Sequence, residues 1–367
     1  MLRVCLDYRP AILTSAGIGR ATRELARAIA ARNDVQLHLF AHSLSPAARP
    51  DRPPPGARLH RLPIPGRTLP WLARLGLPAP RLAGGPHAFH WTDYVHPPTG
   101  RTPAVLTLHD LAFAADPSFH GAESGALLQR TQAAARGAAV IVTPTQATAA
   151  AAQTHLDVPP EKLRVIAFGA DHVPGTPGDS PRPGRPYALM LGTIEPRKNH
   201  LAVLRAWPKI PDPKPDLVVV GRRGWECDAI VGRLREAEAR GEAIWHDAVD
   251  DAAAFNWLAN AALLIYPSLL EGFGFPPLEA LAMGTPVVAS DIPALREVLG
   301  GAACYCDPQD QLSIIGAIDR SLRHRGLRTE LRERGLARAA ELTWERSAAA
   351  HVEVYRAVAQ GSQPASV

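Results

Sequence analysis

Short apolar runs alternate with longer, mixed stretches along the whole chain. Each short run is bounded by turn residues, which is typical of a buried strand in a parallel sheet. The longer stretches have the length and composition of helices. The fold class is therefore predicted to be α/β, with parallel sheets covered by helices on both faces. The strands are expected at 3–7, 35–41, 58–62, 88–92, 104–108, 140–143, 164–168, 187–191, 217–220, 243–246, 263–266, 287–290 and 303–306, and the helices include 21–31, 145–155, 201–207, 229–240, 252–260 and 312–323.

The alternation is interrupted once, at 171–186, where Pro and Gly recur too often for a helix or a central strand. We interpret this segment as a hinge or linker between two doubly wound, Rossmann-like domains that face a central cleft. The expected parts are a first domain at 1–172, the linker proper at 173–186, a second domain at 187–345 and a last helix at 346–360. We expect this last helix to return to the first domain.

The most informative loop follows the predicted strand 263–266 and reads EGFGFPPLEA over 271–280. Two prolines suit the first turn of a helix, so the loop is predicted to open a helix N-terminus. Gly272 and Gly274 allow close approach of a ligand, and the amides and dipole of the helix start favour an anion such as a diphosphate. Glu271 and Glu279 would accept hydrogen bonds from sugar hydroxyls. The simpler alternative is a tight connection with two solvated glutamates.

A second motif, GTIEPRKN over 192–199, follows the predicted strand 187–191. Arg197 and Lys198 are suited to phosphate oxygens, and Asn199 is a good N-cap for the next helix. These cations and the 271–280 helix start would hold a diphosphate from two sides and stabilise it as a leaving group. An exposed salt-bridge pair is the alternative. The prediction requires 197–198 to lie beside the 271–279 turn.

Two motifs in the first half also lie next to predicted strands. Gly17 and Gly19 resemble half of a dinucleotide fingerprint, but Thr22 stands where the third glycine is needed. A phosphate or acceptor contact through these amides fits the pattern, whereas a nicotinamide site does not. His109 follows the strand 104–108 and is expected to open into the cleft, where it could contact a sugar hydroxyl. A lone histidine is more often structural than catalytic.

The composition is that of a globular chain, because 46% of the 367 residues are hydrophobic and 20% are charged. No run approaches the roughly 18 apolar residues of a membrane span, and no signal peptide is evident, so we expect a cytoplasmic protein. The four cysteines lack the spacing of a disulfide framework or a zinc site, and we interpret them as reduced and structural. No Asp-x-Asp pair occurs, which argues against a metal-bridged diphosphate.

Positive charge is concentrated in the first half. Residues 1–170 hold 18 Lys and Arg against 10 Asp and Glu, whereas the remainder holds 22 against 25. A basic half attracts anionic partners, but no nucleic-acid-binding motif accompanies it, so nucleic acid is not expected. Residues 49–86 interleave Arg and Pro with Leu and Trp. The simpler interpretation is an irregular loop with one short helix, and the alternative is a basic apolar surface for a membrane or lipid-linked substrate.

With these motifs the chain resembles glycosyltransferase family 4, whose members are retaining enzymes of the GT-B fold. The likeness covers nearly the whole length. Within the family it looks most like the mannosyltransferases that build bacterial surface polysaccharides. The most specific stretches are GIGR at 17–20, EPRKN at 195–199, PS at 267–268, EGFGFP at 271–276, EA at 279–280 and GTPVVA at 284–289.

The resemblance implies a role for each matching residue. The first domain would bind the acceptor and the second the nucleotide sugar. Arg197 and Lys198 would hold the donor diphosphate and Glu279 the ribose hydroxyls. His109 would contact the donor sugar. The remaining donor contacts implied are Glu271 with Gly272, Phe273, Gly274 and Phe275, and the N-terminal glycines Gly17 and Gly19.

The resemblance further implies transfer of a hexosyl group, with mannose favoured, to a saccharide acceptor linked to polyprenyl diphosphate. The donor would be GDP-mannose, or else a UDP-sugar or another GDP-sugar, and no metal or other cofactor is expected. Peripheral contact with an anionic membrane would place the protein at the inner face of the plasma membrane. The alternatives are a nucleotide-sugar epimerase of GT-B fold, a phosphorylase that requires pyridoxal phosphate, and a non-catalytic nucleotide-sugar-binding protein.

Overall fold

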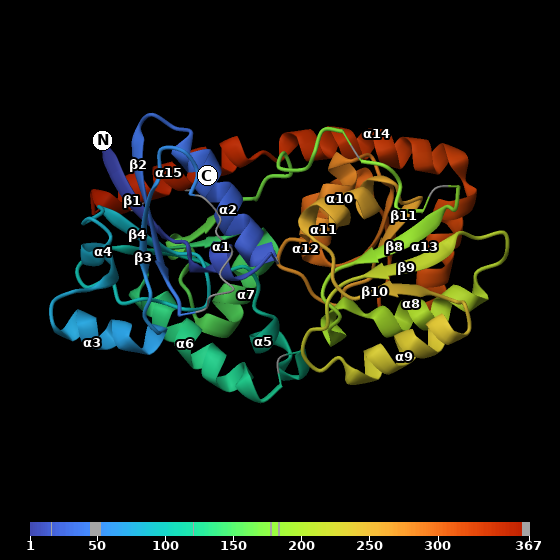
Figure 1. The fold of residues 1–367 in the computed structure, drawn as a ribbon, viewed down its shortest axis with the longest axis horizontal. Helices are drawn as coiled ribbons and strands as arrows, with labels where there is room; N and C mark the ends of the chain where they lie inside the picture. Colours follow the sequence, from blue (N-terminus) through green and yellow to red (C-terminus); the bar gives the residue numbers. More distant parts are fainter. Residues whose placement is uncertain (16, 45–52, 120, 177, 183, 362–367) are drawn as a thin grey trace. The chain divides into compact units, whose positions relative to one another are not determined.

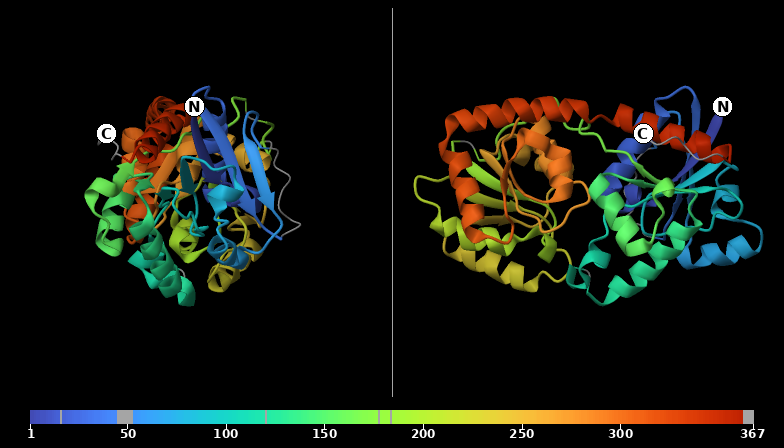
Figure 2. Two further views of the ribbon diagram at one scale, coloured as in Figure 1. Left: turned by 90° about the vertical axis from the view of Figure 1, so that its left-hand side faces the viewer. Right: turned by 180° about the vertical axis from the view of Figure 1, so that it is seen from behind.

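The computed structural model describes every residue except 16, 45–52, 120, 177, 183 and 362–367. The chain forms two compact units, each built on one parallel sheet with helices on both faces (Figure 1, Figure 2). The first unit comprises Met1–Ala115, Gly125–Gly169 and the chain from Trp344 onward, and the second comprises Asp116–Ser124 and Ala170–Thr343. The predicted α/β class, with two Rossmann-like units built on parallel sheets, is therefore confirmed.

The sheet of the first unit has seven strands in the order β3-β2-β1-β4-β5-β6-β7. All its described pairings are parallel. Apolar side chains such as Phe40, Phe89 and Leu106 form the core between this sheet and its helices. The strands are β1 (Leu2–Asp7), β2 (Val35–His42), β3 (Arg58–Leu62), β4 (Ala88–Trp91), β5 (Ala104–Thr107), β6 (Val140–Thr143) and β7 (Leu163–Val165).

Eight helices accompany the first sheet in the described part of this unit: α1 (Arg9–Leu13), α2 (Gly17–Ala30), α3 (Leu69–Arg74), α4 (Ala79–Leu82), α5 (Ala112–Ala115), α6 (Ser124–Gly137), α7 (Gln146–Leu156) and α15 (Trp344–Ala359). Helix α7 begins where the Thr145 side chain accepts a hydrogen bond from the Thr148 amide, as an N-cap does. The predicted strand 58–62 is confirmed as β3, but the segment 49–86, expected to hold one short helix, contains the two short helices α3 and α4, and its residues 49–52 lie outside the described part.

The C-terminal helix α15 belongs to the first unit, where it packs against α2. A buried histidine connects α15 to the sheet through hydrogen bonds. His90 on β4 is hydrogen-bonded through Nδ1 to the Tyr355 hydroxyl at 2.7 Å and through Nε2 to the Thr107 hydroxyl at 2.7 Å. Each partner satisfies one ring nitrogen of a histidine that has no exposure to solvent.

The sheet of the second unit has six parallel strands in the order β10-β9-β8-β11-β12-β13. Its strands are β8 (Tyr187–Leu191), β9 (Asp216–Val220), β10 (Ile244–His246), β11 (Leu263–Tyr266), β12 (Val287–Ser290) and β13 (Cys304–Cys306). Its helices are α8 (His200–Ala206), α9 (Asp228–Ala239), α10 (Asp251–Ala259), α11 (Phe275–Ala282), α12 (Pro293–Leu299), α13 (Gln311–Arg323) and α14 (Arg325–Glu341).

Each sheet has one switch point, the place between two adjacent strands where the order of the strands reverses direction. In the first sheet the chain builds outward from β1 in one direction and from β4 in the other, and in the second it does so from β8 and β11. Parallel sheets of this kind bind ligands at the carboxyl ends of the strands beside such a point. The residues that follow β1 and β4, and those that follow β8 and β11, are therefore the candidates for a binding site.

Candidate functional site

The switch point of the second sheet gathers a cluster of charged side chains. Arg197 and Lys198 lie in a single 3-10 turn that follows β8, and Glu271 lies in the loop between β11 and α11. All three side chains are at most 13% exposed. Because β8 and β11 are adjacent, their carboxyl ends bring these residues together. The predicted juxtaposition of 197–198 with the 271 turn is confirmed.

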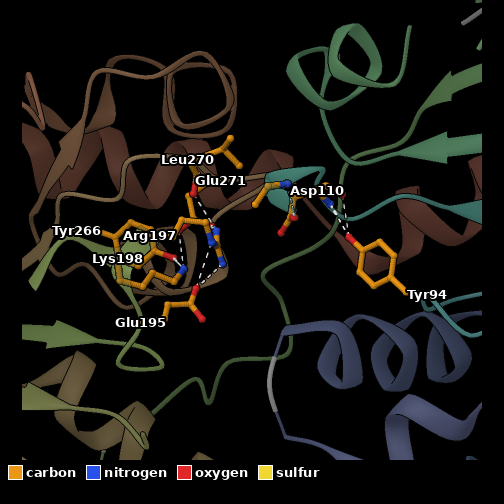
Figure 3. Close-up of polar contacts among 9 residues, drawn as sticks. Tyr94, Asp110, Glu195, Arg197, Lys198, Tyr266, Leu270 and Glu271 are labelled. Atoms are coloured by element: carbon orange, nitrogen blue, oxygen red, sulfur yellow. Dashed lines mark hydrogen bonds and ion pairs between the residues drawn. The ribbon is translucent and has the colours of Figure 1, made fainter. Parts of the chain in front are cut away.

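Arg197 is held between two carboxylates (Figure 3). Its Nε and Nη2 donate to Glu195 Oε1 at 3.1 and 2.8 Å, and its Nη1 donates to Glu271 Oε2 at 2.9 Å. The same Nη1 donates to the Leu270 carbonyl at 2.8 Å. The guanidinium therefore has a fixed orientation. Glu195 was part of the predicted motif but had no role there, and its position two residues before Arg197 was the available signal.

Lys198 shares the other oxygen of Glu271 (Figure 3). Its Nζ donates to Glu271 Oε1 at 2.5 Å and to the Tyr266 hydroxyl at 2.6 Å. Burial lowers the pKa of Lys198, and the charge of Glu271 opposes that effect. Burial raises the pKa of Glu271, but Arg197 and Lys198 outweigh it and bring this pKa to about 2. The carboxylate is therefore ionised at any physiological pH.

The cluster contains two cations and two carboxylates, counting Glu195 and Glu271. The sequence pattern suggested cations facing a phosphate directly, whereas here each cation already contacts a carboxylate. Buried ion pairs of this kind are retained mainly when they fix geometry, since desolvation offsets much of their attraction. The arrangement holds the guanidinium and ammonium in place.

The helix start at α11 agrees with its prediction in one respect and differs in another. Gly274 is the N-cap residue at φ 90°, and a Cβ there would lie 2.6 Å from Leu295 Cδ2, so only glycine fits. However, Pro276 and Pro277 follow Phe275 in the first turn and have no N–H group. The expected row of helix amides is therefore shorter than predicted, and an anion here would depend more on Arg197 and Lys198.

Glu279 lies inside α11 and is 1% exposed. Its Oε1 is hydrogen-bonded to His172 Nε2 at 2.9 Å, and the His172 ring lies against Phe275 with the ring centres 6.1 Å apart. His172 comes from the segment predicted as a linker, and no motif pointed to it. The role of Glu279 toward a ribose stays a prediction.

Asn199 does not act as the expected side-chain cap of α8. It adopts a left-handed conformation at φ 57°, and its side-chain amide donates to the Pro267 and Pro308 carbonyls at 3.2 and 2.8 Å. The prediction was wrong because the left-handed backbone directs the side chain away from the helix amides. Asn199 instead connects the loop after β8 with the loops after β11 and β13.

The switch point of the first sheet gathers a second polar cluster. Asp7 ends β1, Asp93 follows β4 and His109 follows β5. His109 is partly exposed, and its Nε2 donates to the Thr92 carbonyl at 2.9 Å. Burial lowers the pKa of His109, which favours the neutral ring. This hydrogen bond leaves Nδ1 as an acceptor, which suits a hydroxyl group.

Around His109, Arg9 forms an ion pair with Asp93, and the Arg9 amide donates to Asp7 Oδ1 at 3.1 Å. Asp7 is fully buried, and burial raises its pKa to about 7 despite the charge of Arg9. Figure 3 also draws the Tyr94 hydroxyl donating to the Asp110 carbonyl at 2.8 Å. Asp93 was not among the predicted site residues, although it directly follows the predicted strand 88–92 and so lies at its carboxyl end.

The N-terminal glycines have a structural explanation. Gly17 begins α2, and Gly19 lies in its first turn. A Cβ on Gly19 would lie 2.0 Å from the Thr14 carbonyl oxygen, so Gly19 allows α2 to approach the preceding loop. Arg23 donates to the Ala11 and Thr14 carbonyls at 2.9 Å each, which fixes the same loop. The ligand contacts expected of Gly17 and Gly19 remain predictions.

Cys5, Cys227, Cys304 and Cys306 are all buried free thiols, as expected. Within the described residues, no group of three or more His, Cys, Asp or Glu is arranged to hold a metal ion.

In the comparisons with known proteins, the chain is similar to glycosyltransferases. A family model described as "Glycosyl transferases group 1" matches residues 178–338, and one described as "Glycosyltransferase Family 4" matches residues 15–173. The O-antigen chain mannosyltransferase B of Escherichia coli is 29% identical over 285 residues, which is 72% of this chain and 75% of that protein.

Solved structures share the fold. Sucrose-phosphate synthase from Thermosynechococcus elongatus superposes with a TM-score of 0.78 at 21% identity, covering 99% of this chain and 100% of that chain. The Anabaena HepE protein, solved in complex with UDP-glucose, gives a TM-score of 0.72 at 15% identity, covering 96% of this chain and 99% of that chain. At these identities the likeness concerns the fold alone.

Proposed function

Because the chain belongs to glycosyltransferase family 4, we propose that it transfers a hexosyl group from a nucleotide-diphosphate sugar to a saccharide acceptor in cell-surface polysaccharide biosynthesis. The observation that carries this proposal is the cluster of Arg197, Lys198, Glu195 and Glu271 at the switch point of the second sheet. Mannose is the favoured sugar, since the similar E. coli protein is named as an O-antigen chain mannosyltransferase.

The charges of the cluster suit the departure of a diphosphate leaving group. As the bond between sugar and diphosphate breaks, negative charge develops on the leaving group, and fixed cations stabilise it without reorganisation. Arg197 and Lys198 are held in place by carboxylates and so supply such cations. Glu271 uses both of its oxygens on these cations, and each carboxylate oxygen can accept a further hydrogen bond from a sugar hydroxyl. We propose that the sugar keeps its anomeric configuration, which NMR of the product would report.

We place the acceptor at the switch point of the first unit, beside Arg9 and Asp93. Charged side chains paired with one another suit the hydroxyls of a saccharide. The contact with the donor sugar that the resemblance implies for His109 stays a prediction. The acceptor we propose is linked to polyprenyl diphosphate. The protein would then work in the cytoplasm, attached peripherally to the inner face of the plasma membrane. None of the helices in the described residues is long and apolar enough to cross a membrane.

A panel of nucleotides and nucleotide sugars tests the donor. A ligand present at about 100 times its dissociation constant stabilises the protein by about 2.7 kcal/mol, so thermal unfolding reveals which nucleotide binds. GDP-mannose is expected to give the largest shift and to be consumed only when an acceptor is present. A new sugar formed from donor alone would instead indicate an epimerase, and absence of any nucleotide response would overturn the proposal.

Activity is expected to persist in excess EDTA. The positive charge that balances the diphosphate comes from Arg197 and Lys198 in this proposal, so a divalent cation is not required for leaving-group stabilisation. The measurement is the initial rate of transfer before and after dialysis against EDTA. Loss of activity that Mg²⁺ restores would show that a metal takes part.

The variant Glu271→Gln is expected to shift the alkaline limit of nucleotide binding to lower pH. Burial lowers the pKa of Lys198 and the charge of Glu271 opposes this, so removing that charge lowers the pKa further. Only the protonated ammonium attracts a diphosphate, and affinity should therefore start to fall earlier as pH rises. Dissociation constants for GDP between about pH 7 and about pH 10 measure the effect. The control is Glu242→Gln, which neutralises a partly exposed carboxylate of the same unit that pairs with Arg240. Identical profiles for the two variants would contradict the coupling.

A further inference from the structure

The outer side of α3 exposes large apolar side chains. Trp71 is 60% exposed and Leu75, four residues later, is 59% exposed. Residues spaced by four share one face of a helix and the turn that follows it. On the inner side Leu69 is 3% exposed and belongs to the core of the first unit. The helix is therefore anchored by one side and presents the other to solvent, at an outer edge of the first unit (Figure 1).

Leu77 is 37% exposed just beyond the helix. We call Trp71, Leu75 and Leu77 together the Trp71 surface. An exposed tryptophan with neighbouring leucines marks an interaction site more often than an isolated apolar residue does. Tryptophan combines an apolar ring with an N–H donor, which suits the boundary between lipid chains and headgroups.

The stretch of chain that carries the Trp71 surface has charges of one sign. The sequence contains no acidic residue between Asp51 and Asp93. The same stretch contributes five arginines that are exposed in the structure: Arg58, Arg61, Arg67, Arg74 and Arg81. In the part of the chain that the structure describes, none of these five is paired with a carboxylate, and Arg81 donates to the Gly76 carbonyl. Their guanidinium groups are therefore available to an anionic partner.

We propose that the Trp71 surface docks on an anionic phospholipid bilayer, with Trp71 and Leu75 inserted among the headgroups and the arginines contacting lipid phosphates. This deepens the proposed function and rests on it in one respect, namely that a lipid-linked acceptor requires the protein to reach a membrane. Basic residues beside a short apolar surface are the combination that anionic leaflets attract. Three apolar side chains form too small a surface for a stable protein interface, which buries about 800 Å² on each partner.

Vesicle binding by the full-length protein tests the assignment. Vesicles that contain about one third phosphatidylglycerol in phosphatidylcholine are compared with pure phosphatidylcholine by co-sedimentation, at low and high salt. We expect binding to the anionic vesicles only, weakened by salt, and accompanied by a blue shift of tryptophan fluorescence. The double variant Trp71→Ala/Leu75→Ala and the triple variant Arg67→Gln/Arg74→Gln/Arg81→Gln should each lower the affinity at least about tenfold.

Matched substitutions on the second unit provide the control. Leu312 is 77% exposed and Trp225 is 40% exposed, so Trp225→Ala/Leu312→Ala removes comparable apolar side chains elsewhere. This control should bind vesicles like the wild type. Unchanged binding by the Trp71→Ala/Leu75→Ala variant would overturn the proposal. So would a concentration-dependent dimer, seen by light scattering, that this variant abolishes while vesicle binding stays the same.

The same preparations separate this proposal from the proposed function. Thermal shifts with GDP and GDP-mannose are recorded for each variant. We expect the variants to lose vesicle binding and keep the nucleotide response, because the substituted residues belong to the first unit and the candidate donor cluster belongs to the second. Vesicle binding without any nucleotide response would leave the docking surface intact and refute the glycosyltransferase proposal. A nucleotide response without vesicle binding would refute the docking surface and leave the glycosyltransferase proposal intact.

Discussion

Replacing Lys198 by alanine is expected to lower kcat/KM for the nucleotide sugar roughly 10- to 150-fold. A charge-assisted hydrogen bond is worth about 1.5–3 kcal/mol, and this range corresponds to that loss. The ammonium is held by Glu271 and Tyr266, so it stays in place as charge develops on the leaving diphosphate. The measurement is the initial rate of transfer over a range of donor concentrations, together with the thermal shift given by GDP.

Two further variants serve as controls for Lys198→Ala. Lys198→Met keeps the apolar stem and removes only the charge, so it should show the same loss. Lys209→Ala removes an exposed lysine of the same unit whose Nζ donates to the Gln311 side chain, and it should behave like the wild type. The fold should survive Lys198→Ala because Glu271 keeps its contact with Arg197. Full activity of either Lys198 variant would remove this residue from the site.

The core of this site could be predicted from sequence because it follows from topology. Strand β8 and strand β11 were both recognisable as buried apolar runs, and residues after adjacent parallel strands must meet at one edge. Arg197, Lys198 and Glu271 therefore had to be neighbours once the fold class was known. All thirteen strands among the described residues correspond to predicted runs, with ends that differ by a few residues, most at β7, where the ladder with β6 stops at Val165.

The remaining details depend on tertiary contacts that no local pattern encodes. The hydrogen bonds from Arg197 to Glu195 can be inferred only when the orientation of the Arg197 side chain is known. His172 is hydrogen-bonded to Glu279 although the two residues are 107 positions apart in the sequence. Asn199 was expected to cap a helix, but its left-handed backbone directs the side chain to two carbonyls. One detail needed no structure: the prolines that predict the start of α11 also lack the amides that an anion would use, as the sequence itself shows.

The second prediction concerns Asp7, and it links stability to the candidate acceptor site. Asp7→Asn is expected to stabilise the first unit at about pH 8 by up to about 4 kcal/mol, and to have little effect near pH 4. Burial raises the pKa of Asp7 from 3.8 to about 7. Each unit of pKa shift corresponds to about 1.4 kcal/mol, so a shift of about three units sets the upper limit.

The sign follows from which state binds the proton. Below pH 3.8 both the folded and the unfolded chain hold the proton on Asp7, and its burial carries no charge penalty. Between pH 3.8 and about 7 the unfolded chain releases the proton and the folded chain keeps it, so stability falls as pH rises. Above about pH 7 the folded chain holds a buried carboxylate, and the neutral asparagine avoids this penalty while keeping an oxygen for the Arg9 amide.

Asp34→Asn is the matched control because its pKa moves the other way. The Asp34 carboxylate contacts Arg32 and Arg356 near the surface of the same unit, and the hydrogen bond from Arg32 lowers its pKa. Neutralising Asp34 should therefore weaken the folded state at about pH 8, where neutralising Asp7 strengthens it. Denaturant unfolding at several pH values measures both. If Asp7→Asn destabilises the protein at about pH 8 as Asp34→Asn does, the raised pKa is wrong. If it stabilises the protein but slows transfer, the buried carboxylate beside Arg9 and Asp93 is kept for function at the expense of stability.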